Sequence, residues 1–449
     1  DRSLAPAERG STLQIEICVR RAVCSPSLAV TKEKPKKTVP PSGRITSIDA
    51  LRGFVMFMMI FVNDLAGAPR EFTPDWMVHF SDRHKGGSGM TFVDLVFPGF
   101  LFIVGMSIPF ALGSRFNKGI PLWKTVLHVL TRTLALLMLG ILMVNGESGG
   151  KPLWVATMFF SCIFAFCNLS PRGAPPTSAK FWQIFNLSIR GLGFIGILWC
   201  ALTFARKTKN GFSHILTLYP LHINTGWYGI LGLIGWAYLA GAILYLVFRT
   251  NRTALLAGVA VMTLFYAAAR NGFFSHFWPA HYVDFGGTLG SQAAITVAGV
   301  LLASILVSPD KSTHRSRIYF TLLFIAGFAF AALLAGSLYG ISKNNATPAW
   351  CLWADAITAA LWLIFYFVCD IWPVKWISRP LAAAGQNVLL AYLMSEMMEA
   401  VFDLLHLGDW YGGLAEHSLA GAIMRSAGCG IVILAITVGL NRVGFRLRL

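Results

Sequence analysis

Charged residues are scarce in this chain. Asp, Glu, Lys and Arg make up 13% of its 449 residues, whereas 55% are hydrophobic and the mean hydropathy is +0.62. A soluble protein of this size carries about twice that charged fraction. The composition therefore excludes an ordinary soluble domain and predicts an all-α fold, a polytopic transmembrane helical bundle in the lipid bilayer.

Acidic residues are especially few. The chain has 20 Asp and Glu against 37 Lys and Arg, a net charge of +17. In a membrane protein this excess reports topology first, because Lys and Arg accumulate in cytoplasmic loops. The basic residues are scattered between apolar runs, so nucleic acid is not an expected partner.

Paired cysteines and a signal peptide are also missing. The cysteine spacing resembles neither a disulfide framework nor a metal site, so no metal is expected. Residues 1–47 contain no apolar segment typical of a signal peptide. They are predicted to form a disordered or vector-encoded basic tail, followed by a single transmembrane domain over residues 48–449.

About twelve apolar runs follow the tail, and a count of ten or eleven stays open. A helix of about 17–25 residues crosses a hydrocarbon core of about 30 Å. The predicted spans are 48–68, 92–113, 124–146, 152–168, 184–205, 226–248, 253–270, 290–307, 317–339, 350–370, 381–402 and 420–441. The distribution of Lys and Arg predicts a cytoplasmic N-terminus, which places the connection 69–91 on the far side. Arg206, Lys207 and Lys209 break this pattern.

The stretch from Asp49 to Ser107 concentrates the polar groups. Its connection holds His79 and His84, and an imidazole can transfer protons near neutral pH. Either histidine is as well explained as a solvated loop residue, and local chemistry does not choose between them.

Each polar residue within the first two spans can have either a catalytic or a structural role. Asn63 can orient an imidazole or stabilise an oxyanion, or it can form an interhelical hydrogen bond. Thr91 and Asp94 fit a helix-capping pattern, although a capped Asp94 can also orient a nearby histidine. Pro98 is expected to kink the second span.

Two arginines are candidate phosphate ligands near the cytoplasmic side. Arg52 lies three residues after Asp49 and shares its helix face, and Arg132 lies inside the third span, where a cation needs a partner. Flanking positive charge explains Arg52 equally well. Two later polar stretches, 342–350 and 385–387, either line a cavity or form turns and caps.

Several motifs together resemble one family. The segments RITSIDALRGF, FVND, GMTFVDLVFPGFLFIVGMSIP, ISKNNATPAWCLWADA and LAAAGQNVLLAYL are similar to the heparan-α-glucosaminide N-acetyltransferase family of membrane acyltransferases, and most of all to its bacterial members. The likeness covers roughly residues 44–440.

This resemblance implies an activity and assigns roles. It implies acetyl transfer from cytoplasmic acetyl-CoA to an amino sugar or glycan on the periplasmic side, in the inner membrane of a bacterium; a homodimer stays open. It selects His84, five residues before Gly89, as base or acyl carrier. Asn63 and Asp94 would assist it.

The same resemblance suggests which residues bind the acetyl donor, and one alternative function stays open. Arg52 and Arg132 would bind the CoA phosphates. The alternative is a non-enzymatic permease or exporter of a sugar or amphiphile, although the internal repeat of many transporters is not visible in this sequence.

Overall fold

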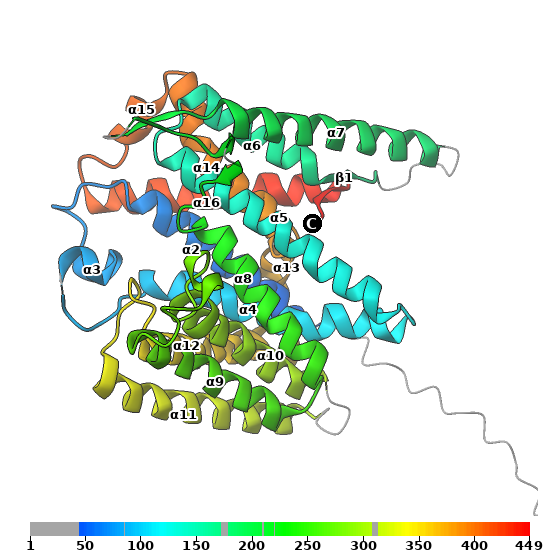
Figure 1. Cartoon of the computed structure of the whole chain (residues 1–449), viewed down its shortest axis with the longest axis vertical. Coiled ribbons are helices and arrows are strands. Elements are labelled where there is room, and N and C mark those ends of the chain that lie inside the picture. The colour runs from blue at the N-terminus through cyan, green and yellow to red at the C-terminus, as the bar shows by residue number, and fades with distance from the viewer. Residues whose placement is uncertain (1–44, 85, 172–177, 209–210, 220, 308–312) are drawn as a thin grey trace, which may run out of the picture. The chain divides into compact units, whose positions relative to one another are not determined.

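Helices make up most of the chain that the computed structural model describes (Figure 1). The described residues are 45–84, 86–171, 178–208, 211–219, 221–307 and 313–449. The predicted tail, residues 1–47, lies almost wholly outside them. The main helices are α2 (Thr46–Leu65), α3 (Phe80–Arg83), α4 (Val93–Asn117), α5 (Leu122–Glu147), α6 (Pro152–Phe166), α7 (Ala179–Thr203), α8 (Gly229–Phe248), α9 (Arg252–Arg270), α10 (Ala293–Val307), α11 (His314–Tyr339), α12 (Pro348–Tyr366), α13 (Lys375–Ala384), α14 (Val388–Leu404), α15 (Gly408–Gly413) and α16 (Leu419–Arg442).

Short 3-10 and π segments complete these helices. They are η1 (Asp75–Met77), η3 (Trp278–His281), η4 (Gly287–Gln292), which leads into α10, and η6 (Phe367–Ile371), which extends α12. Within the described ranges, nine helices are long and apolar enough to cross a membrane, and helices also lie at the other three predicted spans, as α2, α6 and α14. The prediction of an all-α polytopic bundle is confirmed.

One predicted span is divided. Residues 381–402 were expected as a single helix, but α13 ends at Ala384 and α14 begins at Val388. The backbone of Asn387 is not helical, and its side chain holds it there by donating to the carbonyl of Phe445 (3.2 Å) and accepting from the N–H of Leu447 (3.2 Å). At the same place Gly385 packs directly on α2, where an added Cβ would overlap the carbonyl of Asp49.

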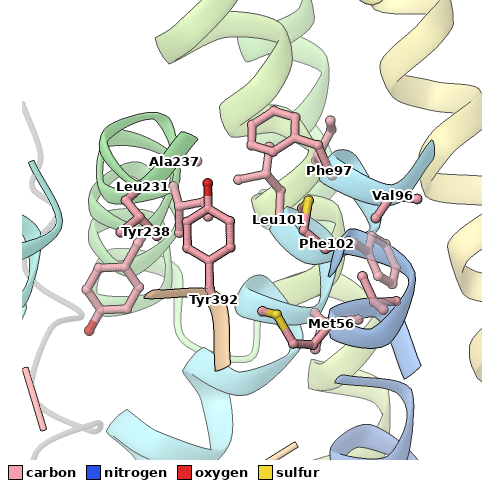
Figure 2. Packing of buried hydrophobic residues seen from close by; sticks show 14 of the residues in the cluster. Met56, Val96, Phe97, Leu101, Phe102, Leu231, Ala237, Tyr238 and Tyr392 are labelled. Atoms are coloured by element: carbon pink, nitrogen blue, oxygen red, sulfur yellow. The ribbon is translucent and has the colours of Figure 1, made fainter. Parts of the chain in front are cut away.

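The centre of the bundle is built around α10. Every residue of this helix from Ala293 to Leu306 is buried. Glycines allow α4 to approach it closely, since a Cβ on Gly105 or Gly299 would overlap the backbone of the other helix. Beside this contact, one continuous apolar cluster joins Met56 of α2, Phe102 of α4, Tyr238 of α8 and Tyr392 of α14 (Figure 2). By contrast, α7, α9 and α11 expose apolar faces, as expected of helices in contact with lipid.

Three short antiparallel pairings lie among the connections. Strand β1 (Cys167–Leu169) pairs with β6 (Phe445–Leu447), and two hairpins between α7 and α8 are formed by β2 (Arg206–Thr208) with β3 (Gly211–Ser213) and by β4 (Leu216–Leu218) with β5 (Leu221–Ile223). The guanidinium of Arg206 donates to the carbonyl of Ser148, just after α5 (3.3 Å).

The connections and helix ends of the bundle gather at two opposite ends. The connection 66–92, the last turn of α5, the first turn of α12 and α15 share one end, which we call the loop end (Figure 1). The α4–α5 and α8–α9 turns and the start of α2 lie at the opposite end. Arg206 therefore belongs to the loop end, where the charge rule did not expect a cation.

Candidate functional site

Asp94 organises a polar site at the loop end. Its carboxylate lies in the first turn of α4 and is 2% exposed. Oδ1 lies 2.7 Å from Nδ1 of His79, and Oδ2 accepts from the backbone N–H groups of Phe80 (3.1 Å) and Thr91 (3.0 Å). A buried carboxylate with three donors is fully satisfied, so its orientation is fixed.

The capping prediction for Asp94 is half correct. The carboxylate does reach back to the N–H of Thr91, as a capping box requires. The Thr91 hydroxyl, however, donates to the carbonyl of Val78 (2.7 Å), and no side chain caps the helix start at Phe92. The Thr91 hydroxyl therefore holds Val78, the residue before His79, in place. The Asp94 carboxylate, which partly caps α4, also binds His79.

A lysine distant in sequence completes the site. Nζ of Lys343 lies 3.1 Å from Nε2 and 3.2 Å from Nδ1 of His79. A carboxylate only accepts hydrogen bonds, so the contact with Asp94 keeps the proton of a neutral imidazole on Nδ1. The lone pair is then on Nε2, where it can accept a proton once Lys343 moves away. The His79 side chain is 34% exposed, which keeps it accessible.

The segment after α11 positions Lys343. The N–H of Gly89 donates to the carbonyl of Ile341 (3.0 Å), and the N–H of Ile341 donates to the hydroxyl of Ser88 (2.8 Å). The indole N–H of Trp350 donates to the backbone carbonyl of Asp94 (3.2 Å), which ties α12 to the start of α4. The polar stretch 342–350 was one of the two sequence signals for a cavity lining, and it supplies this lysine.

His84, the histidine that the resemblance selects, lies elsewhere on the same connection. It directly follows α3, is exposed, and its ring centroid lies 4.7 Å from that of Phe80. The contacts with Asp94 belong to His79. The catalytic assignment of His84 stays a prediction, and the geometry supplies His79 as a second candidate.

Asn63 connects two helices. Its amide donates to Oε1 of Glu396 on α14 (2.9 Å), which is the interhelical hydrogen bond of the simpler reading. No contact with either histidine is found within the described ranges. Glu396 is a residue that the sequence did not single out.

The neighbouring Asp64 is held by α15 and α16. It accepts from Tyr411 (2.6 Å), Arg425 (3.0 Å) and Ser426 (2.5 Å). Burial and the Asp64 carboxylate raise the pKa of the Tyr411 hydroxyl. These contacts fasten the C-terminal helices to the end of α2.

The two predicted phosphate ligands have separate surroundings. The guanidinium of Arg52 is bound by Asp49 (3.0 Å), Ser107 (2.6 Å) and the carbonyl of Gly385 (3.2 Å). Arg132 instead lies with its guanidinium 4.8 Å from the ring centroid of Tyr238. The structure does not bring these two arginines together.

Arg115 and Arg132 both lie near the imidazole of His128, and we call these two arginines the cation cluster around Arg132. Arg115 and His128 interact electrostatically with one another, and His128 also with Arg132. The Nε atoms of Arg115 and Arg132 are buried, and neither has a hydrogen-bond partner within the described ranges. No carboxylate pairs with either arginine in this part of the chain, so the cluster favours an anion.

Comparisons with known proteins agree with the motifs. Residues 44–150 match a family model described as a domain of unknown function, DUF5009. The chain is 33% identical over 107 residues to the heparan-alpha-glucosaminide N-acetyltransferase of Homo sapiens, which is 24% of this chain and 14% of that protein. It is 30% identical over 112 residues to the enzyme of the same name from Mus musculus, which is 25% of this chain and 16% of that protein.

The predicted resemblance to this enzyme family is therefore confirmed over about a quarter of the chain. The match spans less than a fifth of the length of either curated relative. The match to the family model, residues 44–150, includes Asp94 and both histidines.

Proposed function

We propose that this chain is a membrane acetyltransferase that passes the acetyl group of acetyl-CoA to the amine of an amino sugar. The observation that carries the proposal is the Asp94–His79–Lys343 arrangement, which supplies an oriented base and a cation in a chain partly similar to N-acetyltransferases. The donor would arrive from the cytoplasm, and the acceptor amine from the periplasm.

His79 is proposed as the base in place of His84. The acceptor nitrogen attacks the thioester carbonyl carbon and forms the C–N bond. Nε2 of His79 takes the proton that the neutral amine nitrogen loses, and the C–S bond breaks. The imidazolium then gives this proton to the leaving CoA thiolate, which restores the neutral His79. Asp94 holds the imidazole in the required tautomer and stabilises the imidazolium that forms.

Lys343 would stabilise negative charge. Its ammonium lies beside the imidazole, close to where the carbonyl oxygen of the thioester becomes an oxyanion. The acceptor must displace the Lys343 ammonium from Nε2 of His79 before a proton can be transferred to this nitrogen. Lys343 would therefore move from His79 toward the oxyanion as the acceptor enters.

The cation cluster around Arg132 is the proposed contact for the CoA phosphates. CoA carries several negative charges and cannot cross hydrocarbon, so its phosphates must remain at the cytoplasmic side while the thioester reaches inward. Arg132 and Arg115 each have a buried Nε without a hydrogen-bond partner within the described ranges, and neither is in an ion pair there. Arg52 is occupied by Asp49, Ser107 and Gly385, which makes it the weaker of the two predicted ligands.

The test is acetyl transfer in proteoliposomes. Acetyl-CoA is supplied on one side and glucosamine on the other, and both free CoA thiol and N-acetylglucosamine are measured. The proposal expects the two products in equal amounts and only when glucosamine is present. A permease would release no CoA in response to glucosamine, and that result would refute the enzyme.

A further inference from the structure

Asp355 is the most deeply buried carboxylate in the described part of the chain. It lies on α12, two turns after Pro348, the first residue of that helix, and it is 0% exposed. Neither Oδ1 nor Oδ2 has a hydrogen-bond partner among the residues that the structure describes. Ionisable groups inside a membrane bundle are costly and almost always have a partner, so a carboxylate without one indicates a site.

A proton alone does not satisfy this carboxyl group. Its protonated form has an O–H that donates and a C=O that accepts, and a buried group of either kind ordinarily has a partner. Its ionised form needs donors or a cation to compensate the buried charge. In both forms Asp355 therefore needs a ligand that the described residues do not supply.

A second buried oxygen without a partner lies on the neighbouring element. Ser291, in η4, is also 0% exposed, and its Oγ has no hydrogen-bond partner within the described ranges. A Cβ added to Gly287, the first residue of η4, would lie 3.5 Å from the Cβ of Ala346, just before α12. Because η4 with α10 and α12 pack together from this contact inward, Ser291 lies beside the first turns of α12.

The side chain of Cys351 lies between the two oxygens. Cys351 precedes Asp355 by one helical turn, and its thiol is close to both Asp355 and Ser291. Long side chains on a helix lean over the preceding turn, so the Asp355 carboxylate leans toward Cys351 and the level of Ser291. The fold therefore brings the unpartnered carboxylate and hydroxyl oxygens to one place between α12 and η4.

We infer that Asp355 and Ser291 bind a small monovalent cation, such as Na⁺, inside the bundle. Hard cations prefer oxygen ligands, and both residues offer oxygen atoms that nothing else in the described ranges occupies. No ion pair to Asp355 is found in that part of the chain. A single positive charge therefore cancels the carboxylate, whereas a divalent ion would leave a net charge in an apolar interior.

A bound cation would join α12 to η4 and α10. The first turn of α12 carries Trp350, whose indole donates to the carbonyl of Asp94, and the stretch just before it carries Lys343. Occupancy would therefore stabilise the helix start that supports the polar site at the loop end. The cation site itself does not depend on whether the chain transfers acetyl groups.

The experiment is equilibrium binding of radiolabelled Na⁺ to the purified full chain in detergent, without acetyl-CoA. Choline chloride keeps the ionic strength constant, and thermal unfolding is followed in the same buffers. The wild-type protein is expected to bind about one Na⁺ per chain saturably. Its unfolding temperature should rise by about 5 °C at a Na⁺ concentration of about a hundred times Kd. Ca²⁺ at the same concentration should not displace the bound Na⁺.

Two substitutions test the ligands. Asp355→Asn removes the charge and nearly keeps the shape, and it should abolish both the binding and the effect of Na⁺ on unfolding. Ser291→Ala should raise the Kd for Na⁺ by about tenfold, as expected for the loss of about one ligand contact. Ser304→Ala is the matched control, because Ser304 is an equally buried serine of α10 whose hydroxyl already donates to the carbonyl of Leu301 (2.7 Å), and it should bind Na⁺ as wild type.

Four results would overturn the inference. The wild-type protein may show no saturable binding of Na⁺, which would mean that a proton and water occupy the carboxyl group instead. Asp355→Asn may bind Na⁺ as wild type does, or Ca²⁺ may displace Na⁺ equally well. Finally, Ser291→Ala may bind no more weakly than Ser304→Ala, a comparison that decides the matter even if Asp355→Asn does not fold.

Discussion

Replacing Asp94 by Asn separates the chemical role of this residue from its structural role. The carboxylate receives two backbone N–H groups on Oδ2 and the imidazole on Oδ1. An Asn side chain has a single acceptor oxygen, and the two N–H groups of Phe80 and Thr91 will hold it. The amide NH₂ then faces Nδ1 of His79, which must accept instead of donate.

This reversal moves the proton to Nε2, the nitrogen that is proposed to act as base. General base catalysis contributes about 10²–10⁴-fold, so acetyl transfer should fall by at least about a hundredfold. Stability should fall less steeply, by about 1–2 kcal/mol, since hydrogen bonds to a charged group are replaced by neutral ones while the backbone contacts remain.

The assay is acetyl transfer in proteoliposomes together with thermal unfolding in detergent. Asp64→Asn is the matched control, because Asp64 also has several donors at the loop end, and none of them, among the residues that the structure describes, is a histidine. It should lower the unfolding temperature and leave the rate per folded molecule near that of wild type. A folded Asp94→Asn protein with a wild-type rate would refute the tautomer argument.

Further changes test other parts of the account. Lys343→Ala should lower kcat by about 10²–10³-fold with little change in KM, and Lys343→Arg should restore part of the lost kcat. If the Arg variant is no faster than the Ala variant, the oxyanion role of Lys343 is wrong. Arg132→Ala should raise the KM for acetyl-CoA about tenfold without changing that for glucosamine, as measured by initial rates. Gly385→Ala should destabilise the fold by more than about 1–3 kcal/mol in thermal unfolding, because the added methyl overlaps α2, whereas Gly412→Ala, with open space around it, should not. Because the pKa of Tyr411 is raised, the unfolded chain loses this proton near pH 10 while the folded chain keeps it; stability should fall above about pH 10, and less so in Tyr411→Phe.

The bundle itself was predictable because its signals are local. Apolar runs of sufficient length identify helices without any knowledge of their neighbours. The span at 381–402 was wrong because its interruption depends on Asn387 bonding to Phe445 and Leu447, about sixty positions later in the chain. Hydropathy does not record such a contact.

The site was predictable only in part, for the same reason. Asp94 was identified, and its likeness to a cap was half correct. The choice between His79 and His84 depends on how the connection folds back, through the bond from Thr91 to Val78 and the bond from Phe80 to Asp94. Lys343 lies 264 positions from His79, so only the polar character of its own stretch signalled it.

The most direct test of the central claim compares two single substitutions in the same connection. Acetyl transfer from acetyl-CoA to glucosamine is measured in proteoliposomes for His79→Ala and His84→Ala, with equal amounts of folded protein. The account predicts that His79→Ala loses at least about a hundredfold in rate and that His84→Ala stays within a few-fold of wild type. Loss of activity in His84→Ala with wild-type activity in His79→Ala would contradict it.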